Sequence, residues 1–356
     1  MLPVSVGYIG GNDNPRSKMD IMTTSKTDTL LDLSLACWDY DRAQAVLDGT
    51  VAVPGCAIRA EVHPTSTLFP LAVGEARFDV TEMSMSSYIL EVAKGEGAYV
   101  ALPVFLSRAF RHNGFVVRAD AGIENPKDLE GKRVGVPEYQ MTAALWMRGI
   151  LTEEYGVDTD SFQWRTGALE EGTRKDRLTL DLPGHMSVTP IETGETLQDL
   201  LLAGELDAVF APKPLNALVA GDPRVRRLFP DFAAVERAYH AKTGFFPIMH
   251  AIGLRKTLAE ANPWLPKALF DAFTQSRDLA MAKLESIWRG SANRLTLPFF
   301  HAEMEETRAL MGPDYWTYGF AANRAELDAM CRWSQAQHLA PRRVAPEELF
   351  HQSLLS

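Results

Sequence analysis

Two arginines and a histidine stand close together between two apolar runs of the chain. Arg108, Arg111 and His112 fall in the turn of a predicted strand–turn–strand unit that extends from Pro103 to Arg118. A guanidinium group is a permanently charged, forked donor that matches a carboxylate, and an imidazole can gain or lose a proton near neutral pH. This set therefore suits an anionic substrate that undergoes proton transfer. A surface hairpin with solvated arginines explains these residues alone equally well.

Strand ends that meet helix starts supply a second group of candidates. We predict a buried strand over Leu33 to Trp38 and another over Phe78 to Ser84, each followed by a helix. In α/β proteins such ends carry the functional sites, so Trp38, Glu82 and Ser84 become candidates. Free backbone N–H groups and serine hydroxyls there would hold an anion, although helix capping explains the serines as well. Trp38 is equally typical of a core or rim aromatic residue.

Another helix start follows the predicted strand Val134 to Pro137. Its residues include Tyr139, Gln140 and Thr142, and we expect Thr142 to be the helix cap. The positive end of a helix dipole and its unpaired N–H groups favour a carboxylate, so this start is a second candidate anion site. Arg148 lies outside the apolar stripe of the same helix.

Further histidines need to be weighed against simpler roles. His250 lies in a predicted apolar strand, Ile248 to Leu254, that returns the chain to the first sheet. An isolated histidine on such a strand is more often a hydrogen-bonded core residue than a catalyst. His301 and Glu305 have helical spacing but lack a third metal ligand, and a solvated helix face is the commoner explanation. We therefore expect no metal site.

Composition places the chain among ordinary globular proteins. Its 356 residues, 46% hydrophobic and 23% charged, suggest two lobes rather than one core. A formal charge of -10, without a Lys/Arg-rich tract, argues against nucleic acid as a partner. There is no apolar run of about 18 residues and no apolar export segment in residues 1–29, so we expect no membrane span and a cytoplasmic location. Cys37, Cys56 and Cys331 are expected to be reduced thiols.

Six motifs occur in order along the chain: Leu33 to Arg42, Phe78 to Ser84, Ser107 to His112, Val134 to Thr142, Thr243 to His250 and Tyr315 to Gly319. Together they resemble the 4,5-dihydroxyphthalate decarboxylase family, from about Leu31 to Phe350. The resemblance implies an α/β, periplasmic-binding-protein-like type II fold, in which two crossing strands join two lobes and the ligand lies in the cleft. We expect an extension over 1–30, a first lobe over 31–127 and 240–356 with a helical C-terminal region, and a second lobe over 128–239.

The resemblance also implies a reaction, the conversion of 4,5-dihydroxyphthalate to protocatechuate and CO2 without an organic cofactor. Direct loss of CO2 from an arene would leave an aryl anion that the ring cannot delocalise. Each carboxyl-bearing carbon of this substrate is para to a hydroxyl, so removing the hydroxyl proton lets that carbon be protonated first. The site then needs a base at the hydroxyl edge, an acid over the ring and donors for the second carboxylate.

Roles in this scheme follow from the residue types. Arg108 and Arg111 would hold carboxylates, with help from the predicted helix start. His112 and His250 are the candidates for proton transfer, and Glu82 is a candidate base or an orienting residue for the hydroxyls. The sequence leaves open which histidine is the acid.

The departing carboxylate should lie beside an apolar wall, because its charge disappears in the transition state. Trp38, Met83 and Phe246 are candidates for this wall. The predicted substrate-binding residues are Arg108, Arg111, Trp38, Ser84, Tyr139, Gln140, Thr142, Arg148 and Phe246.

Two other functions remain open. A solute-binding protein or sensor with this fold would close on an aromatic acid without reacting. A decarboxylase of a related hydroxylated aromatic acid would use the same residues. The helical C-terminal third, with Trp316, Trp333 and Phe350, offers apolar surface for a homodimer.

Overall fold

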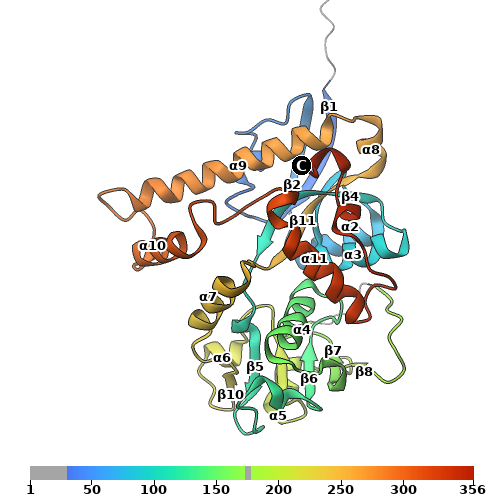
Figure 1. The fold of residues 1–356 in the computed structure, drawn as a ribbon, viewed down its shortest axis with the longest axis vertical. Coiled ribbons are helices and arrows are strands. Elements are labelled where there is room, and N and C mark those ends of the chain that lie inside the picture. The colour runs from blue at the N-terminus through green and yellow to red at the C-terminus, as the bar shows by residue number, and fades with distance from the viewer. Residues whose placement is uncertain (1–29, 173–177) are drawn as a thin grey trace, which may run out of the picture.

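The computed structural model describes residues 30–172 and 178–356. Two β-sheets, each packed against helices, form an upper and a lower lobe in Figure 1. The predicted α/β two-lobed architecture is confirmed. The predicted extension over 1–30 lies almost entirely outside the described residues.

The first lobe is built on a five-stranded sheet in the order β2-β1-β3-β11-β4. Strand β1 pairs in parallel with β2 and β3, whereas β11 runs antiparallel to β3 and β4. Because β11 comes from late in the chain, this lobe is discontinuous in sequence. The strands are β1 Leu31–Cys37, β2 Cys56–Val62, β3 Val80–Ser84, β4 Tyr99–Arg108 and β11 Ile248–Arg255.

The second lobe contains a six-stranded sheet in the order β10-β5-β9-β6-β7-β8. Strands β9, β6, β7 and β8 are parallel, and β5 and β10 are antiparallel additions at one edge. The central strands β9 and β6 are buried except for half-buried Arg133 at the start of β6, as expected of a sheet covered on both faces. The strands are β5 Phe115–Arg118, β6 Arg133–Val136, β7 Gln163–Thr166, β8 Ser187–Pro190, β9 Ala208–Phe210 and β10 Val225–Arg227.

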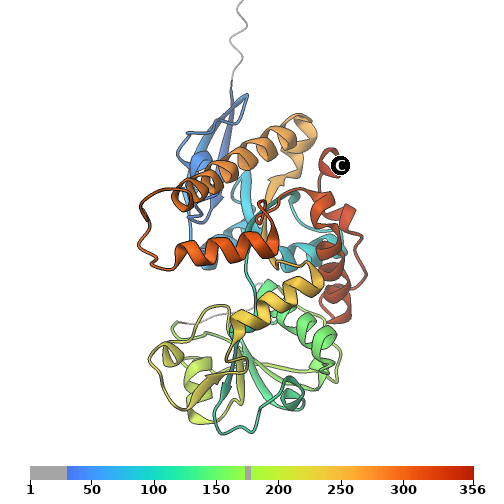
Figure 2. The same ribbon diagram turned by 60° about the vertical axis from the view of Figure 1, so that its left-hand side comes forward.

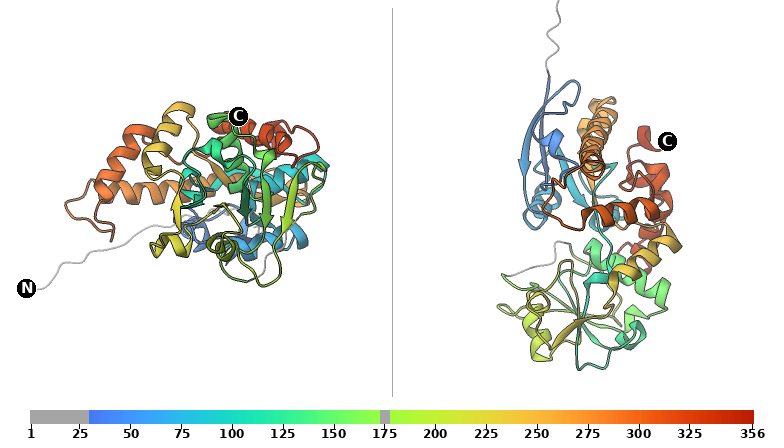
Figure 3. Two further views of the ribbon diagram at one scale, coloured as in Figure 1. Left: turned by 90° about the horizontal axis from the view of Figure 1, so that it is seen from below. Right: turned by 90° about the vertical axis from the view of Figure 1, so that its left-hand side faces the viewer.

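Helices surround both sheets, and a long C-terminal helical region belongs to the first lobe. In Figure 1, α9 extends beyond the sheet and α10 folds back beneath its far end; the same two orange helices lie in front of the first lobe in Figure 2 and project from the molecule in the left view of Figure 3. The helices are α1 Gln44–Leu47, α2 Thr65–Glu75, α3 Met85–Lys94, α4 Thr142–Tyr155, α5 Leu197–Ala203, α6 Asn216–Val219, α7 Phe232–Thr243, α8 Lys256–Ala261, α9 Leu265–Trp288, α10 Phe300–Met311 and α11 Phe320–Ala336. No helix within the described ranges is long and apolar enough to cross a membrane.

The crossing between the lobes lies earlier than the sequence predicted. We placed the strand at Phe115 in the first lobe, but β5 pairs with β9 and β10 in the second sheet. The stretch with Arg111 and His112 is therefore the crossing itself, between Arg108 and Phe115, rather than the turn of a hairpin. Two apolar runs around a short polar turn predict two strands, but they do not say that the strands join the same sheet. The chain returns through α7 to β11.

Helices α4 and α11 hold the lobes together through tight aromatic packing. The rings of Trp146 on α4 and Trp333 on α11 meet edge to face, with centroids 4.9 Å apart. Gly149 lets the two helices approach, because a Cβ at this position would lie 2.4 Å from Trp333 Cδ2. One buried apolar cluster consequently runs from the first sheet through this contact into the second lobe.

We predict that Gly149→Ala destabilises the protein by about 1–3 kcal/mol, because the added methyl group overpacks the contact with Trp333. Gly74 is the matched control, since it is also helical and a Cβ there would meet nothing within 4 Å. Gly74→Ala should leave the free energy of unfolding unchanged or raise it by about 0.5 kcal/mol. Urea unfolding of both variants measures the difference. Equal stability of the two would contradict the packing account.

Candidate active site

A cavity of roughly 400 Å³ lies between the lobes, large enough for a single-ring aromatic acid. We call it the interlobe cavity. First-lobe strand ends, the crossing segment and the start of α4 all contribute to its wall. Its lining residues are Trp38, Tyr40, Thr65, Ser66, Phe69, Ser84, Ser107, Ala109, Arg111, Met141, Thr142, Ala143, Pro212, Lys213, Met249 and His250.

Glu82 on β3 is a fully buried carboxylate behind this wall. It accepts hydrogen bonds from Tyr40 Oη at 2.7 Å, from the backbone N–H of Trp38 at 3.0 Å and from His250 Nδ1 at 2.6 Å. A buried charge is tolerated only when donors satisfy it, and these three come from β1's end and from β11. Burial and the charge of Glu82 together raise the pKa of Tyr40 well above its usual value, so its hydroxyl stays a donor.

The contact with Glu82 fixes the protonation pattern of the His250 ring. An ionised carboxylate only accepts hydrogen bonds, so Nδ1 must carry a hydrogen. Nε2 is then the nitrogen left to exchange a proton, and the side chain remains 16% exposed where it lines the interlobe cavity. The ring of Phe69 contacts the imidazole edge to face at 4.8 Å. This arrangement gives His250 the geometry of an oriented acid or base.

An irregular strand pairing presents His250 to the cavity. On β3 the residue opposite His250 is Ser84, which places Glu82 two residues away on the same face. The pairing of β11 with β4 shifts register on both sides of His250. Such irregularities re-aim side chains and occur next to active sites. Pro103 on β4 falls in the irregular section, which suits a residue that cannot donate to a ladder.

Two cationic side chains line the same cavity from the crossing and the second lobe. Arg111 is buried, and its Nη1 donates to the carbonyl of Pro212 at 3.2 Å. Its Nε has no partner among the described residues. Burial lowers the pKa of Arg111 to about 10, which leaves it charged at neutral pH. Lys213 forms an ion pair with Glu170 at 2.6 Å, with most of its side chain exposed.

Helix starts from both lobes complete an anion-binding environment. Thr65 and Ser66 open α2, and Thr142 opens α4, and all three line the cavity. Unpaired N–H groups and the positive dipole end of each helix favour a carboxylate. Thr142 was predicted as the cap of α4, but Met141 occupies that position. The Thr142 hydroxyl instead bridges the lobes.

That bridge joins Thr142 to the end of β3. Thr142 Oγ1 lies 2.8 Å from Ser84 Oγ and accepts from the backbone N–H of Ser86 at 3.1 Å. The predicted candidates Ser84 and Thr142 are thus brought together at the cavity wall. Their hydroxyls satisfy each other across the lobe boundary.

Arg108 lies outside the cavity wall. Its buried guanidinium group donates to the carbonyls of Phe246 and Thr317 and forms an ion pair with Glu326 at 3.2 Å. It also contacts Asn323 Oδ1. Arg108 therefore ties the end of β4 to the C-terminal helices. Phe246 lies in the same region, where its ring stacks on Phe110 at 4.9 Å.

Arg148, Tyr139 and Gln140 are also buried away from the cavity. Arg148 stacks on the Tyr139 ring at 3.8 Å and donates through Nε to Gln337 Oε1 at 2.7 Å. The Gln140 amide donates to Glu138. An arginine outside the apolar stripe of α4 therefore points toward the segment that follows α11, a neighbour that helical periodicity does not reveal.

His112 is enclosed by aromatic rings. Phe229 and Tyr239 lie 5.2 and 5.4 Å from its centroid, and neither ring nitrogen has a hydrogen-bond partner among the described residues. Desolvation lowers its pKa to about 4. His112 and His250 were both candidates for proton transfer, but the structure brings only His250 to the cavity wall.

The apolar part of the wall only partly matches the prediction. Trp38 lines the cavity, whereas Met83 is buried and packs close to Gly253. Phe69, Met249 and Lys213 line it without having been predicted. Phe69 follows Thr65 by four residues in α2, so the two side chains lie on the same face of the helix, and both line the cavity.

Comparison with known proteins gives close relatives over most of the chain. A protein named 4,5-dihydroxyphthalate decarboxylase from Comamonas testosteroni is 42% identical over 325 residues, which cover 91% of this chain and 98% of that protein. A protein of the same name from Pseudomonas putida is 40% identical over 201 residues, 56% of this chain and 78% of that protein. A family model described as NMT1/THI5 like matches residues 60–170.

Solved structures extend the likeness to the fold. The periplasmic aliphatic sulphonate binding protein SsuA from Escherichia coli aligns over 92% of this chain and 99% of its own, with a TM-score of 0.53 and 13% identity. A sulfonate-binding protein from Methylobacillus flagellatus aligns over 90% of this chain and 92% of its own, with a TM-score of 0.52 and 13% identity. At this identity the two structures support the two-lobed fold alone.

We predict that His112 makes stability depend on pH. Its pKa is about 4 in the folded protein and about 6.5 in an unfolded chain. Between these values the unfolded state binds more protons, so the free energy of unfolding should fall on the order of 3 kcal/mol as pH drops from about 7 to 4.

His112→Phe tests this, because phenylalanine keeps a ring in the aromatic cage and cannot be protonated. Urea unfolding at several pH values should give a smaller pH dependence for the variant than for wild type, whatever its absolute stability. An unchanged pH dependence would show that His112 is not the source.

Proposed function

Because the chain belongs to the 4,5-dihydroxyphthalate decarboxylase family, we propose that it is a carboxy-lyase that converts 4,5-dihydroxyphthalate to protocatechuate and CO2. The reaction takes place in the interlobe cavity. The observation that carries this proposal is the oriented imidazole of His250, held by buried Glu82 at 2.6 Å in the wall of a cavity that also contains Arg111. This combination can supply a proton to a bound dicarboxylate.

The chemistry requires protonation before carbon–carbon cleavage. Loss of the hydroxyl proton para to the carboxyl-bearing carbon pushes an electron pair to that carbon, which takes a proton and becomes tetrahedral. The bond to the carboxylate then breaks, CO2 leaves, and the electron pair of that bond restores the aromatic ring as a phenolate, which takes back from water the proton that the hydroxyl had released to water. One proton replaces one CO2 overall. An acid placed over the ring therefore lowers the barrier of the whole sequence.

His250 is the residue that we assign as this acid. Nδ1 is engaged by Glu82 and the residue lines the cavity, so Nε2 is the nitrogen left to carry the proton to be transferred. The carboxylate of Glu82 holds the orientation of the ring, as a carboxylate does for a catalytic histidine elsewhere. Glu82 is fully buried and carries three hydrogen bonds, which supports an orienting role over that of a base for the catechol hydroxyls.

The cationic groups suit the carboxylate that remains on the product. Arg111 and Lys213 line the cavity near the start of α4 and would hold this spectator group. The carboxylate that departs should lie by Trp38, Phe69 or Met249, since an apolar surface destabilises the charge that disappears. Uniformly tight binding of both carboxylates would slow the reaction.

A ligand-binding protein without catalysis is the alternative, in keeping with the binding proteins that share the fold. Arg111, Lys213 and two helix starts would be sufficient to bind a dicarboxylate. They do not explain why a buried carboxylate orients a histidine in the same wall. A related hydroxylated aromatic acid as substrate is compatible with the same residues.

We predict that wild-type protein purified after metal chelation consumes 4,5-dihydroxyphthalate and releases protocatechuate. His250→Ala should lose at least about 100-fold in kcat, because general acid catalysis is removed. The kcat of Glu82→Gln should lie between those of wild type and His250→Ala, because glutamine keeps the shape of the glutamate side chain but lacks its charge. Product formation is followed by chromatography.

The matched control is His112→Phe, which changes a histidine outside the cavity wall and should keep kcat within a few-fold of wild type. Circular dichroism of each variant separates loss of activity from loss of fold. Unchanged ligand after incubation with folded wild type would favour the binding protein. Full activity of His250→Ala would remove the proposed acid.

We also predict that Arg111→Met raises KM for 4,5-dihydroxyphthalate by roughly 10- to 100-fold, since a charge-assisted hydrogen bond to a carboxylate contributes about 1.5–3 kcal/mol. Arg59, exposed on β2, is the control, and Arg59→Met should leave KM unchanged. Steady-state kinetics measures both. A loss confined to kcat would place Arg111 in another role.

A further inference from the structure

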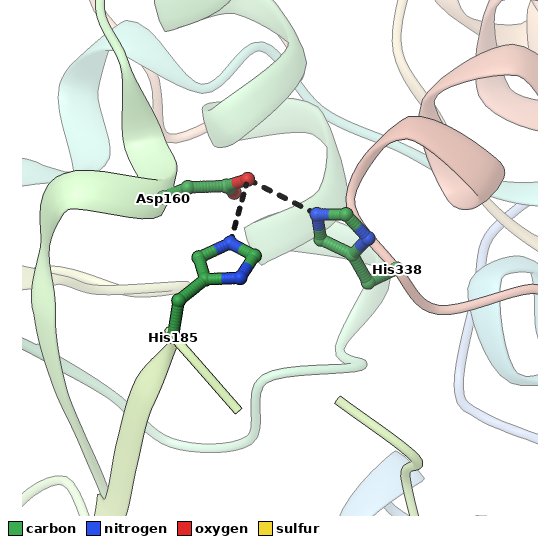
Figure 4. Close-up of side chains that lie close together, drawn as sticks. All are labelled: Asp160, His185 and His338. Carbon is green, nitrogen blue, oxygen red and sulfur yellow. Dashed lines mark hydrogen bonds and ion pairs between the residues drawn. The ribbon is translucent and has the colours of Figure 1, made fainter. Parts of the chain in front are cut away.

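A second group of ionisable side chains lies outside the interlobe cavity. Asp160, His185 and His338 each offer a ligand atom, and these atoms all lie within 4.8 Å of one another. His338 Nε2 is 3.0 Å from Asp160 Oδ2, and His185 Nε2 is 3.8 Å from the same oxygen. Figure 4 shows both imidazole rings turned toward the carboxylate. None of the three residues lines the interlobe cavity.

We propose that Asp160, His185 and His338 bind a divalent transition-metal ion, with Zn²⁺ as the best match, and that the bound ion ties the second lobe to the segment after α11. Two imidazole nitrogens and one carboxylate oxygen form a donor set that suits zinc rather than magnesium or calcium. The proposal is independent of the decarboxylation chemistry.

The spacing of the donor atoms fits a zinc ion after a small adjustment. With bonds of about 2.0–2.2 Å, the ligand atoms of a tetrahedral zinc ion lie roughly 3.4 Å apart. The two observed nitrogen–oxygen distances, 3.0 and 3.8 Å, lie on either side of this value. The side chain of His185 is 63% exposed and can move without disturbing the core. Water would complete the coordination at this accessible position.

Asp160 and His338 lie on backbone that is held in place. Asp160 belongs to a short helical turn before β7, in which its N–H donates to Asp158 Oδ1 at 3.1 Å. His338 directly follows Gln337, whose side chain bonds Arg148 and the Leu145 carbonyl at 2.7 and 3.0 Å. Two preformed ligands leave one flexible side chain to be ordered on binding, which lowers the entropic cost.

His338 occupies a position that usually selects another residue. Its φ of 62° is left-handed, and the N–H groups of Leu339 and Ala340 both donate to the carbonyl of Ser334 at 2.9 Å. Such helix ends favour glycine or asparagine, because a Cβ is strained there. A histidine at this place costs stability in the metal-free protein, and metal binding offsets that cost.

The three ligands come from both sides of the lobe junction. Asp160 lies just before β7 and His185 just before β8, both in the second sheet. His338 follows α11, which packs against α3 of the first lobe and α4 of the second. An ion at this point would add a cross-link beside the contact of Trp146 with Trp333. It would therefore stabilise the junction against unfolding.

The test uses untagged, full-length protein freed of metal by chelation and then titrated with Zn²⁺. Isothermal titration calorimetry should show one saturable site per chain, and the melting temperature should rise by several degrees at saturation. His185→Ala and Asp160→Asn should abolish both effects. Mg²⁺ should give neither.

Two further variants separate metal binding from effects on folding. His338→Gly should be at least as stable as wild type without metal, because glycine suits the left-handed backbone, but should not respond to Zn²⁺. His301→Ala removes a histidine from an unrelated helix and should respond like wild type. Absence of a saturable Zn²⁺ effect in wild type, or an equal effect in His185→Ala, would overturn the proposal.

Discussion

The buried charge of Glu82 is the constraint on which the site depends. A carboxylate with no exposure to water must be surrounded by donors, and in this fold they come from the end of β1 and from β11. The hydrogen bonds to Glu82 consequently orient Trp38, Tyr40 and His250 together. A strand from late in the chain is thereby fixed beside strands from its beginning, so the same contacts that join the two parts of the discontinuous lobe also orient the imidazole of His250.

The crossing segment and the second lobe add positively charged side chains to the cavity wall. Arg111 lies on the crossing and α4 begins directly at the cavity, so both are positioned by the way the lobes are joined. That joint rests on the contact between Trp146 and Trp333, with Gly149 allowing close approach. The same helix, α4, therefore contributes its start to the cavity wall and packs its middle against α11.

The sequence was sufficient for local features and insufficient for long-range pairing. Apolar runs and capping residues predicted the strands around Glu82 and His250. Of the candidates on these strands or at their ends, Trp38, Ser84 and His250 do line the cavity. Arg108, Arg148 and His112 were predicted to be site residues because of their side-chain chemistry, but each is buried outside the cavity wall. Residue type does not reveal which distant segment a side chain contacts. Lys213 carried no signal beyond an ordinary surface lysine. The crossing was misplaced because β5 joins a sheet assembled from later segments.

A crystal structure with protocatechuate or phthalate bound would test the central claim most directly. We expect the ligand ring in the interlobe cavity, with His250 Nε2 over the carbon that gains the proton, Nδ1 still bonded to Glu82, and Arg111 contacting a carboxylate. A ligand bound outside the interlobe cavity near Arg108, or bound in the cavity with His250 turned away from the ring, would contradict this claim.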